Sequence, residues 1–122
     1  MTALDGRLVL MVEDDPATAR MYSLRLRRDG CQVVVAENAA AAEREFAAAR
    51  PDVVLADSRL PGGSGSELAG RLAGHGAPVI LLTNDQHAYD RAPSGVRALI
   101  KARTSPARLS AVITEVLSGS SP

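Results

Sequence analysis

Short apolar runs of strand length alternate with longer stretches of helical character along this chain. Five apolar runs are expected to be strands: 7–12, 32–36, 53–56, 79–82 and 98–100. Each run is almost continuously apolar, which is typical of strands that are buried on both faces of a sheet. The pattern therefore predicts an α/β fold, in which helices cover both faces of a parallel sheet.

A capping side chain precedes each of the longer stretches, and in three of the four it comes with proline or with capping-box spacing. The helices predicted from them span 16–29, 39–49, 64–72 and 106–117. In the first helix, Ala17, Met21 and Leu24 follow helical spacing along one side. The segment 84–95 lacks a clear pattern, and about two helical turns over 85–91 are the alternative to a loop.

The length of 122 residues fits one domain, with a core expected over 7–117 and a frayed tail over 118–122. The formal net charge is zero, so no basic excess favours nucleic acid as a partner of this chain. Cys31 is the only cysteine, which excludes an internal disulfide. No signal-peptide pattern and no apolar stretch of about 18 residues is present, so we expect a cytoplasmic location. The start at Met1 favours a stand-alone protein over a fragment.

Polar side chains follow four of the predicted strands at their carboxyl ends. Glu13 and Asp14 follow the first strand, Asp57 the third, Thr83 the fourth and Lys101 the fifth. In open parallel sheets, sites form beyond the carboxyl ends of the strands. We therefore expect these five side chains to meet at one edge of the sheet.

The three acids of this group predict a Mg²⁺ site. Clustered carboxylates repel one another unless a cation lies among them, and Mg²⁺ takes one or two carboxylates together with water and phosphate oxygens. Glu13, Asp14 and Asp57 are the candidate ligands, and Asp57 is also a candidate nucleophile towards phosphorus. Lys101 would then neutralise charge on the transferred group, and Thr83 would hydrogen-bond one of its oxygens.

Five stretches carry a resemblance to a known family: VLMVEDDPATAR, ENAAAA, RPDVVLADSRLPGGSG, APVILLTND and ALIK. In this order they resemble the receiver domain of two-component response regulators, over nearly the whole chain. The resemblance implies a flavodoxin-like, doubly wound sheet of five parallel strands in the order 2-1-3-4-5. It also implies that the domain catalyses only its own phosphorylation and dephosphorylation.

The resemblance assigns a role to each site residue. Asp57 matches the phosphoacceptor, Asp14 the direct Mg²⁺ ligand, and Glu13 a ligand that acts largely through water. The backbone carbonyl of Arg59 would be a further Mg²⁺ ligand. Thr83 and Lys101 match the family's switch hydroxyl and phosphate-binding lysine. The implied phosphodonor is a phosphohistidine on a histidine kinase or a histidine phosphotransfer protein, and a downstream protein target would read the signal.

Four departures from the family pattern fall on its output face. Ala98 replaces an aromatic residue three positions before the lysine, Ala102 replaces the proline after the lysine, and Asn84 replaces a small residue after the switch hydroxyl. The segment between Thr83 and Lys101 is also shorter by about one helical turn. The usual threonine–aromatic readout is therefore excluded, and we predict that this segment itself is the part that moves.

Two other functions fit parts of the sequence. A receiver-like interaction module with a non-phosphorylated site would explain the altered output face, but it does not explain five retained site residues. A Mg²⁺ phosphohydrolase would also place an Asp nucleophile at a strand end. Ser58 and Arg59 follow Asp57, so the second acid of a haloacid-dehalogenase-like site is missing, and no cap domain is present.

Structural roles are expected for several other residues. Asp15 is expected to cap a helix, and His75 and His87 to lie on the surface. Cys31 reads as a small buried hydrophobe. The glycines between 62 and 65 form no phosphate-binding fingerprint and are expected to be turn formers that let a loop pass near the site.

Overall fold

A five-stranded parallel sheet forms the centre of the molecule. The structure, a computed structural model, describes residues 2–119. The strands are β1 (Leu8–Val12), β2 (Gln32–Ala36), β3 (Val53–Asp57), β6 (Val79–Thr83) and β7 (Val96–Ile100). They lie in the order β2-β1-β3-β6-β7, which confirms the predicted flavodoxin-like order. Two short strands that were not predicted, β4 (Arg59–Leu60) and β5 (Gly63–Ser64), pair in an antiparallel hairpin after β3.

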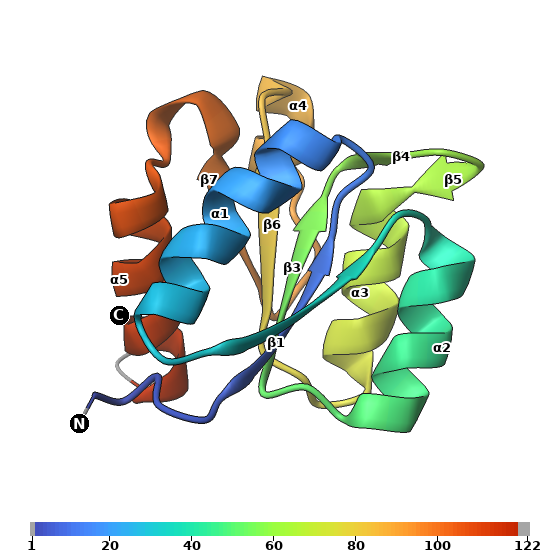
Figure 1. Cartoon of the computed structure of the whole chain (residues 1–122). Helices are drawn as coiled ribbons and strands as arrows, with labels where there is room; N and C mark the ends of the chain where they lie inside the picture. The colour runs from blue at the N-terminus through green and yellow to red at the C-terminus, as the bar shows by residue number, and fades with distance from the viewer. Residues whose placement is uncertain (1, 120–122) are drawn as a thin grey trace.

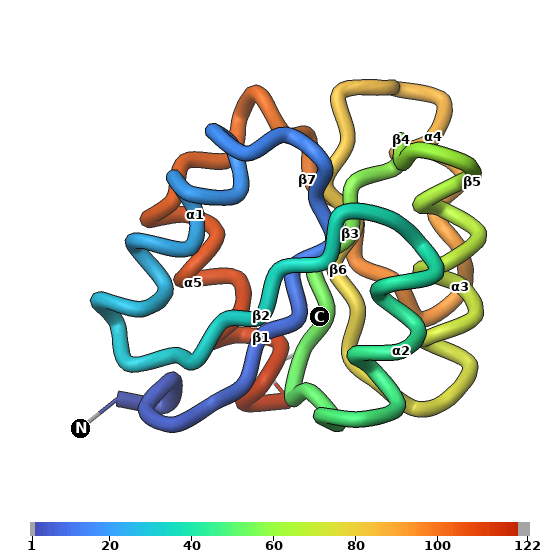
Figure 2. The backbone as a smooth tube through the Cα atoms, turned by 45° about the vertical axis from the view of Figure 1, so that its right-hand side comes forward, coloured from blue at the N-terminus to red at the C-terminus, as the bar shows by residue number. Residues whose placement is uncertain are grey.

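Helices cover both faces of the sheet, as Figure 1 shows. The helices are α1 (Pro16–Arg28), α2 (Ala39–Ala49), α3 (Gly65–Gly74), α4 (Gln86–Asp90) and α5 (Pro106–Leu117), with a 3₁₀ turn, η1 (Lys101–Arg103), after β7. Helices α1 and α5 pack on one face, while α2 and α3 pack on the other. The turned view of Figure 2 shows the same two layers on either side of the strands.

The predicted caps are present at the start of the helices. Asp15 accepts a hydrogen bond from the backbone N–H of Thr18, as expected of a cap. Asn38, Ser64 and Ser105 cap the next three predicted helices in the same way. These side chains satisfy N–H groups that have no partner within the helix, which fixes where each helix begins.

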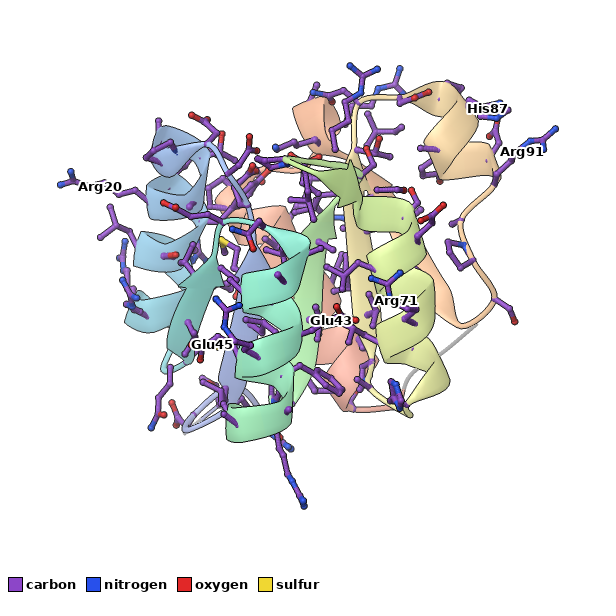
Figure 3. The ribbon with its side chains drawn as sticks, turned by 90° about the vertical axis from the view of Figure 1, so that its right-hand side faces the viewer. Arg20, Glu43, Glu45, Arg71, His87 and Arg91 are labelled. Atoms are coloured by element: carbon purple, nitrogen blue, oxygen red, sulfur yellow. The ribbon has the colours of Figure 1, made fainter. Side chains whose placement is uncertain are left out.

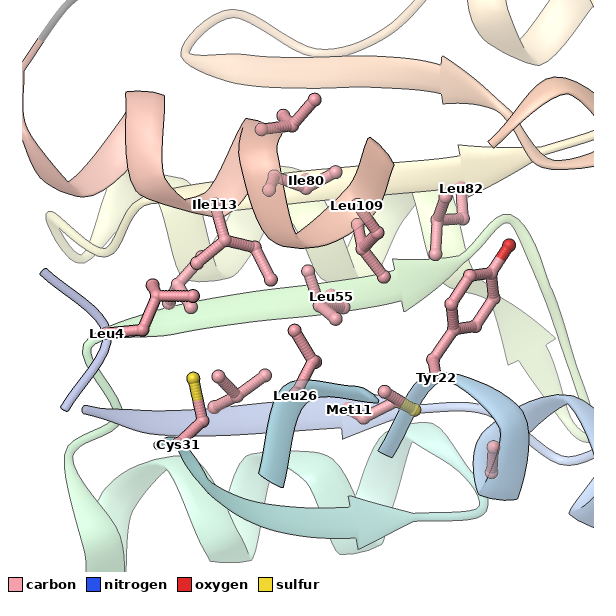
Figure 4. Packing of buried hydrophobic residues seen from close by; sticks show 14 residues of the cluster. Leu4, Met11, Tyr22, Leu26, Cys31, Leu55, Ile80, Leu82, Leu109 and Ile113 are labelled. Carbon is pink, nitrogen blue, oxygen red and sulfur yellow. The ribbon is translucent and has the colours of Figure 1, made fainter. Parts of the chain in front are cut away.

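Each face of the sheet has its own apolar core. Figure 4 shows the core beneath α1 and α5, where Leu26 and Leu109 belong to one cluster with Leu55 and Ile80 of the central strands. All four side chains are fully buried. Burying an aliphatic side chain of this size contributes about 1.5–3 kcal/mol, so this core holds the strand ends in register.

The structure corrects one predicted helix face. Met21 and Leu24 of α1 are exposed, whereas Ala19, Tyr22 and Leu26 are buried. The two sets have the same helical spacing, so spacing alone could not choose between them. The set that includes the large Tyr22 ring faces the sheet because it buries more apolar area.

Several predicted boundaries also move. Helix α3 continues to Gly74, β6 includes Thr83, and β7 begins at Val96. The edge strand β2 is only partly buried, so burial on both faces holds for the inner strands alone. Of the predicted frayed tail, residues 120–122 lie outside the described residues, and Ser118 caps the end of α5.

Candidate functional site

Three carboxylates meet at the carboxyl edge of the sheet. Glu13 and Asp14 follow β1, and Asp57 is the last residue of the adjacent strand β3. One carboxylate oxygen of each lies within 4.8 Å of the others. Asp14 and Asp57 also line a cleft of about 730 Å³ at this edge. The predicted acidic cluster is therefore present, and it opens to a space that a ligand can enter.

Lys101 lies between two of these acids. Its Nζ is 2.5 Å from Glu13 Oε1 and 2.7 Å from Asp57 Oδ2. The side chains of Glu13, Asp57 and Lys101 are 5%, 15% and 18% exposed. Ion pairs that are this shielded from water interact more strongly than pairs on the surface. Lys101 thus joins the tips of β1 and β3 to the turn that follows β7.

The pKa values of the site reflect burial and pairing. Burial raises the pKa of Glu13, although hydrogen bonds from Lys101 and from the Asp15 backbone N–H oppose the rise. Burial would lower the pKa of Lys101, but its hydrogen bonds to Asp57 and Glu13 outweigh this and raise the pKa overall. Lys101 is therefore a permanent cation at neutral pH, placed directly against Asp57.

Thr83 is fully buried and already engaged on both sides. Its Oγ1 lies 2.7 Å from Ser58 Oγ and accepts a hydrogen bond of 2.9 Å from the backbone N–H of Asp85. Ser58 was not predicted as a site residue. The signal was its position directly after Asp57, which carries it to the same edge.

The residues after Asp57 close one side of the cleft. The backbone N–H of Arg59 donates to Asp57 Oδ1 at 3.1 Å. The Arg59 guanidinium lies 3.9 Å from the Asp85 carboxylate, but its side chain is 85% exposed. An exposed pair of this kind contributes little to stability, so Arg59 bears on the site chiefly through its backbone.

Gly65 allows α3 to begin directly against the end of β3. A Cβ at this position would lie only 1.6 Å from the carbonyl oxygen of Asp57. The Gly65 N–H also donates to the carbonyl of Ser58 at 3.0 Å. The glycine was predicted as a turn former, and its actual requirement is this close approach of two backbones.

The other singled-out residues lie away from the site. His75 and His87 are exposed, as predicted, and Figure 3 shows His87 pointing outward from α4. Cys31 is buried in the core, and this burial raises the pKa of its thiol. Within residues 2–119, none of the helices is long and apolar enough to cross a membrane.

Comparison with known proteins agrees with this geometry. The transcriptional regulatory protein KdpE of Mycobacterium tuberculosis is 39% identical over 85 residues, which cover 69% of this chain and 38% of KdpE. The sensory transduction protein RegX3 of the same species is 37% identical over 84 residues, which cover 68% of this chain and 37% of RegX3. The chain therefore spans less than half the length of these curated relatives.

Solved structures of receiver domains resemble this chain as well. The receiver domain of a signal transduction histidine kinase from Syntrophus aciditrophicus superimposes with a TM-score of 0.82 at 29% identity, covering 93% of this chain and 92% of that one. The BeF3-activated receiver domain of RstA from Klebsiella pneumoniae gives 0.78 at 31% identity, covering 90% and 97%. The family model "Response regulator receiver domain" matches residues 9–113. The chain belongs to this family, the phosphoacceptor domains of two-component signal transduction.

Proposed function

We propose that Asp57 is the phosphoacceptor of this domain and that Mg²⁺ assists the transfer. The observation that carries the proposal is the contact of Lys101 with Asp57 beside the Glu13 and Asp14 carboxylates. The metal ligands would be Glu13, Asp14, Asp57 and the backbone carbonyl of Arg59. Among the three clustered acids, Asp57 alone combines contact with the lysine and access to the cleft.

The charges and the donor atoms of the cluster suit Mg²⁺. Three carboxylates and one ammonium leave two negative charges, which one divalent cation balances. All the donors are oxygens, which this hard cation prefers. Asp14 is exposed and free to serve as the direct ligand, whereas Glu13 is buried against Lys101 and is better placed to act through water. When bound, Mg²⁺ would neutralise charge on the phosphoryl oxygens.

The chain's own groups supply the rest of the transfer chemistry. A carboxylate oxygen of Asp57 attacks the phosphorus of a phosphohistidine, so that a new P–O bond forms as the P–N bond breaks. The leaving imidazole nitrogen takes up a proton from the donor protein or from water. Lys101 stabilises negative charge on the phosphoryl oxygens. The Thr83 hydroxyl donates a hydrogen bond to one of these oxygens once its contact with Ser58 is broken.

The partners follow from this chemistry. The donor would be a histidine kinase or a histidine phosphotransfer protein in the cytoplasm, and the receiver would catalyse only its own phosphorylation and dephosphorylation. The zero net charge favours a downstream protein over nucleic acid as the target of this chain. Ala98 offers no ring to follow Thr83, so the 84–97 segment itself would change conformation on phosphorylation.

Mass spectrometry after incubation with acetyl phosphate and Mg²⁺ tests the proposal. The wild type should gain one phosphoryl group, and Asp57→Ala should gain none. Asp52→Ala is the matched control, because Asp52 precedes the same strand at its opposite end. No gain in the wild type, together with no Mg²⁺ binding by calorimetry, would favour the interaction module suggested by the altered output face.

A further inference from the structure

The side chain of Asn84 connects the loop after β6 with the turn that carries Lys101. Asn84 follows β6, and its Oδ1 accepts a hydrogen bond of 2.7 Å from the backbone N–H of Ala102. Ala102 is the middle residue of η1 and directly follows Lys101. The bond therefore ties the loop after β6 to the turn that carries the lysine.

The other end of the same turn is anchored in the core. Thr104 closes η1 by donating its backbone N–H to the Lys101 carbonyl at 3.1 Å. The hydroxyl of Tyr22, a buried residue, donates to the Thr104 carbonyl at 2.7 Å. Two side chains thus hold the turn: Tyr22 bonds the residue at its C-terminal end, and Asn84 bonds its middle residue. Without the Asn84 bond, the turn would keep the contacts of Thr104 with Tyr22, Lys101 and Ile100, but it would lose its side-chain tie to the loop after β6.

Asn84 and Ala102, the two partners of this hydrogen bond, both depart from the family pattern described above. Asparagine supplies a carbonyl oxygen that a small residue lacks, and alanine supplies an N–H that proline lacks. Either usual residue would remove the bond. The two departures are therefore the two halves of one contact, which gives them a common physical reason.

We propose that Asn84 is a positioning residue for Lys101 in phosphoryl transfer, an inference that rests on the proposed function. The lysine acts on the phosphoryl oxygens only where its ammonium is correctly placed, and a misplacement of about 1 Å can cost about 100-fold in rate. Lys101 also bonds Glu13 and Asp57 directly, and neither bond involves Asn84. Loss of the Asn84 bond should therefore have a partial effect.

The experiment measures the rate of phosphorylation by acetyl phosphate with Mg²⁺ in the full chain. Asn84→Ala and Ala102→Pro break the same bond from opposite sides, and each should slow the reaction about five- to tenfold. The double variant should be no slower than the slower single variant, because partners in one contact are not additive. Ala102→Ser keeps the N–H donor and should lose far less rate than Ala102→Pro.

A Lys101→Ala background separates positioning from a general structural role. There, Asn84→Ala should cause no further loss of rate, because the group it positions is gone. An additional loss of fivefold or more would overturn the inference, as would wild-type rates for both Asn84→Ala and Ala102→Pro. Gln32→Ala is the control, because this exposed amide lies at the amino end of the edge strand β2, away from the carboxyl edge that carries the site. Its rate should match the wild type.

The two proposals fail in different ways. If the wild-type chain gains no phosphoryl group, the proposed function fails before Asn84 is tested. If the wild type is phosphorylated and the variants behave like Gln32→Ala, only the positioning role fails. Mg²⁺ affinity is the third readout, and it should change much less in Asn84→Ala than in Lys101→Ala, because Asn84 lies outside the acidic cluster and the variant keeps the lysine.

Discussion

The two sides of the site are built in different ways. On the acid side, the four residues of β3 before Asp57 are fully buried, and α3 starts directly against the strand end at Gly65. On the lysine side, every residue of β7 is only partly buried. Helix α4 has five residues, none of which is buried. Packing therefore fixes the acids, whereas a few hydrogen bonds fix the lysine.

In the proposed function, this difference would place the transfer chemistry on the well-packed side and the conformational change on the lysine side. Buried strands open only with large parts of the fold, while segments with few apolar contacts open at low cost in free energy. The lysine side can therefore change conformation without disturbing Asp57 or its acidic neighbours.

Lys101→Ala should break the link between the two sides. We expect phosphorylation by acetyl phosphate to slow about 100-fold, as when one preorganised charge-stabilising group is removed. Mg²⁺ affinity should instead rise, because a cation that competes for Glu13 and Asp57 is gone. Calorimetric titration with Mg²⁺ checks the second effect. A parallel loss of rate and metal affinity would mean that the lysine holds the acids in place.

Gly65→Ala should damage the acid side directly. The added Cβ would overlap the Asp57 carbonyl oxygen, so we expect a loss of about 2–3 kcal/mol in the free energy of unfolding and weaker Mg²⁺ binding. Urea unfolding measures the first effect. Gly74→Ala is the matched control in the same helix, because a Cβ there meets nothing within 4 Å. Equal stability of the two variants would contradict the packing account.

Native-state hydrogen exchange should distinguish the two sides in one experiment. Amides of α4 should open with a free energy about 2 kcal/mol lower than those of α3, which buries Leu68, Ala69 and Leu72. Phosphorylation should change protection over 84–97 and leave β3 unchanged. Uniform protection across the two helices, or no change over 84–97, would count against the division.

The pH dependence of stability tests the contact between the end of α1 and helix α5. Hydrogen bonds from Ser110 and Arg25 lower the pKa of Asp29, at the end of α1. A depressed carboxyl pKa contributes stability above the unfolded pKa of about 4, and this is lost as pH falls through the lower folded value. Between pH 6 and 3, Asp29→Asn should lose about 1 kcal/mol less stability than the wild type. A parallel decline of the two proteins would refute this role.

The acid side was more predictable from sequence than the lysine side. Strand ends are visible as apolar runs that stop at polar residues, and parallel strands bring those ends to one edge, so Glu13, Asp14 and Asp57 could be placed together in advance. The close approach at Gly65 could not, because it depends on the angle at which α3 leaves the hairpin. The pairing of Ser58 with Thr83 likewise depends on where the chain turns after β3.

The same limit applies to the lysine side and to α1. Asn84 and Ala102 were recognised as departures, but their contact joins residues 18 positions apart and depends on the path of η1. In α1, two faces of equal helical spacing were available, and only packing against α5 and the sheet selects Tyr22 over Met21. Local patterns thus predict which elements form, while long-range contacts determine how their side chains are used.

The hydrogen bond between Tyr22 and Thr104 has a practical consequence. The chain contains no tryptophan and only two tyrosines, so its intrinsic emission and its near-ultraviolet dichroism come almost wholly from these two phenols. One of them is immobilised beneath the turn that carries the lysine. A change in that turn should therefore be visible optically in the unlabelled protein, without an engineered fluorophore.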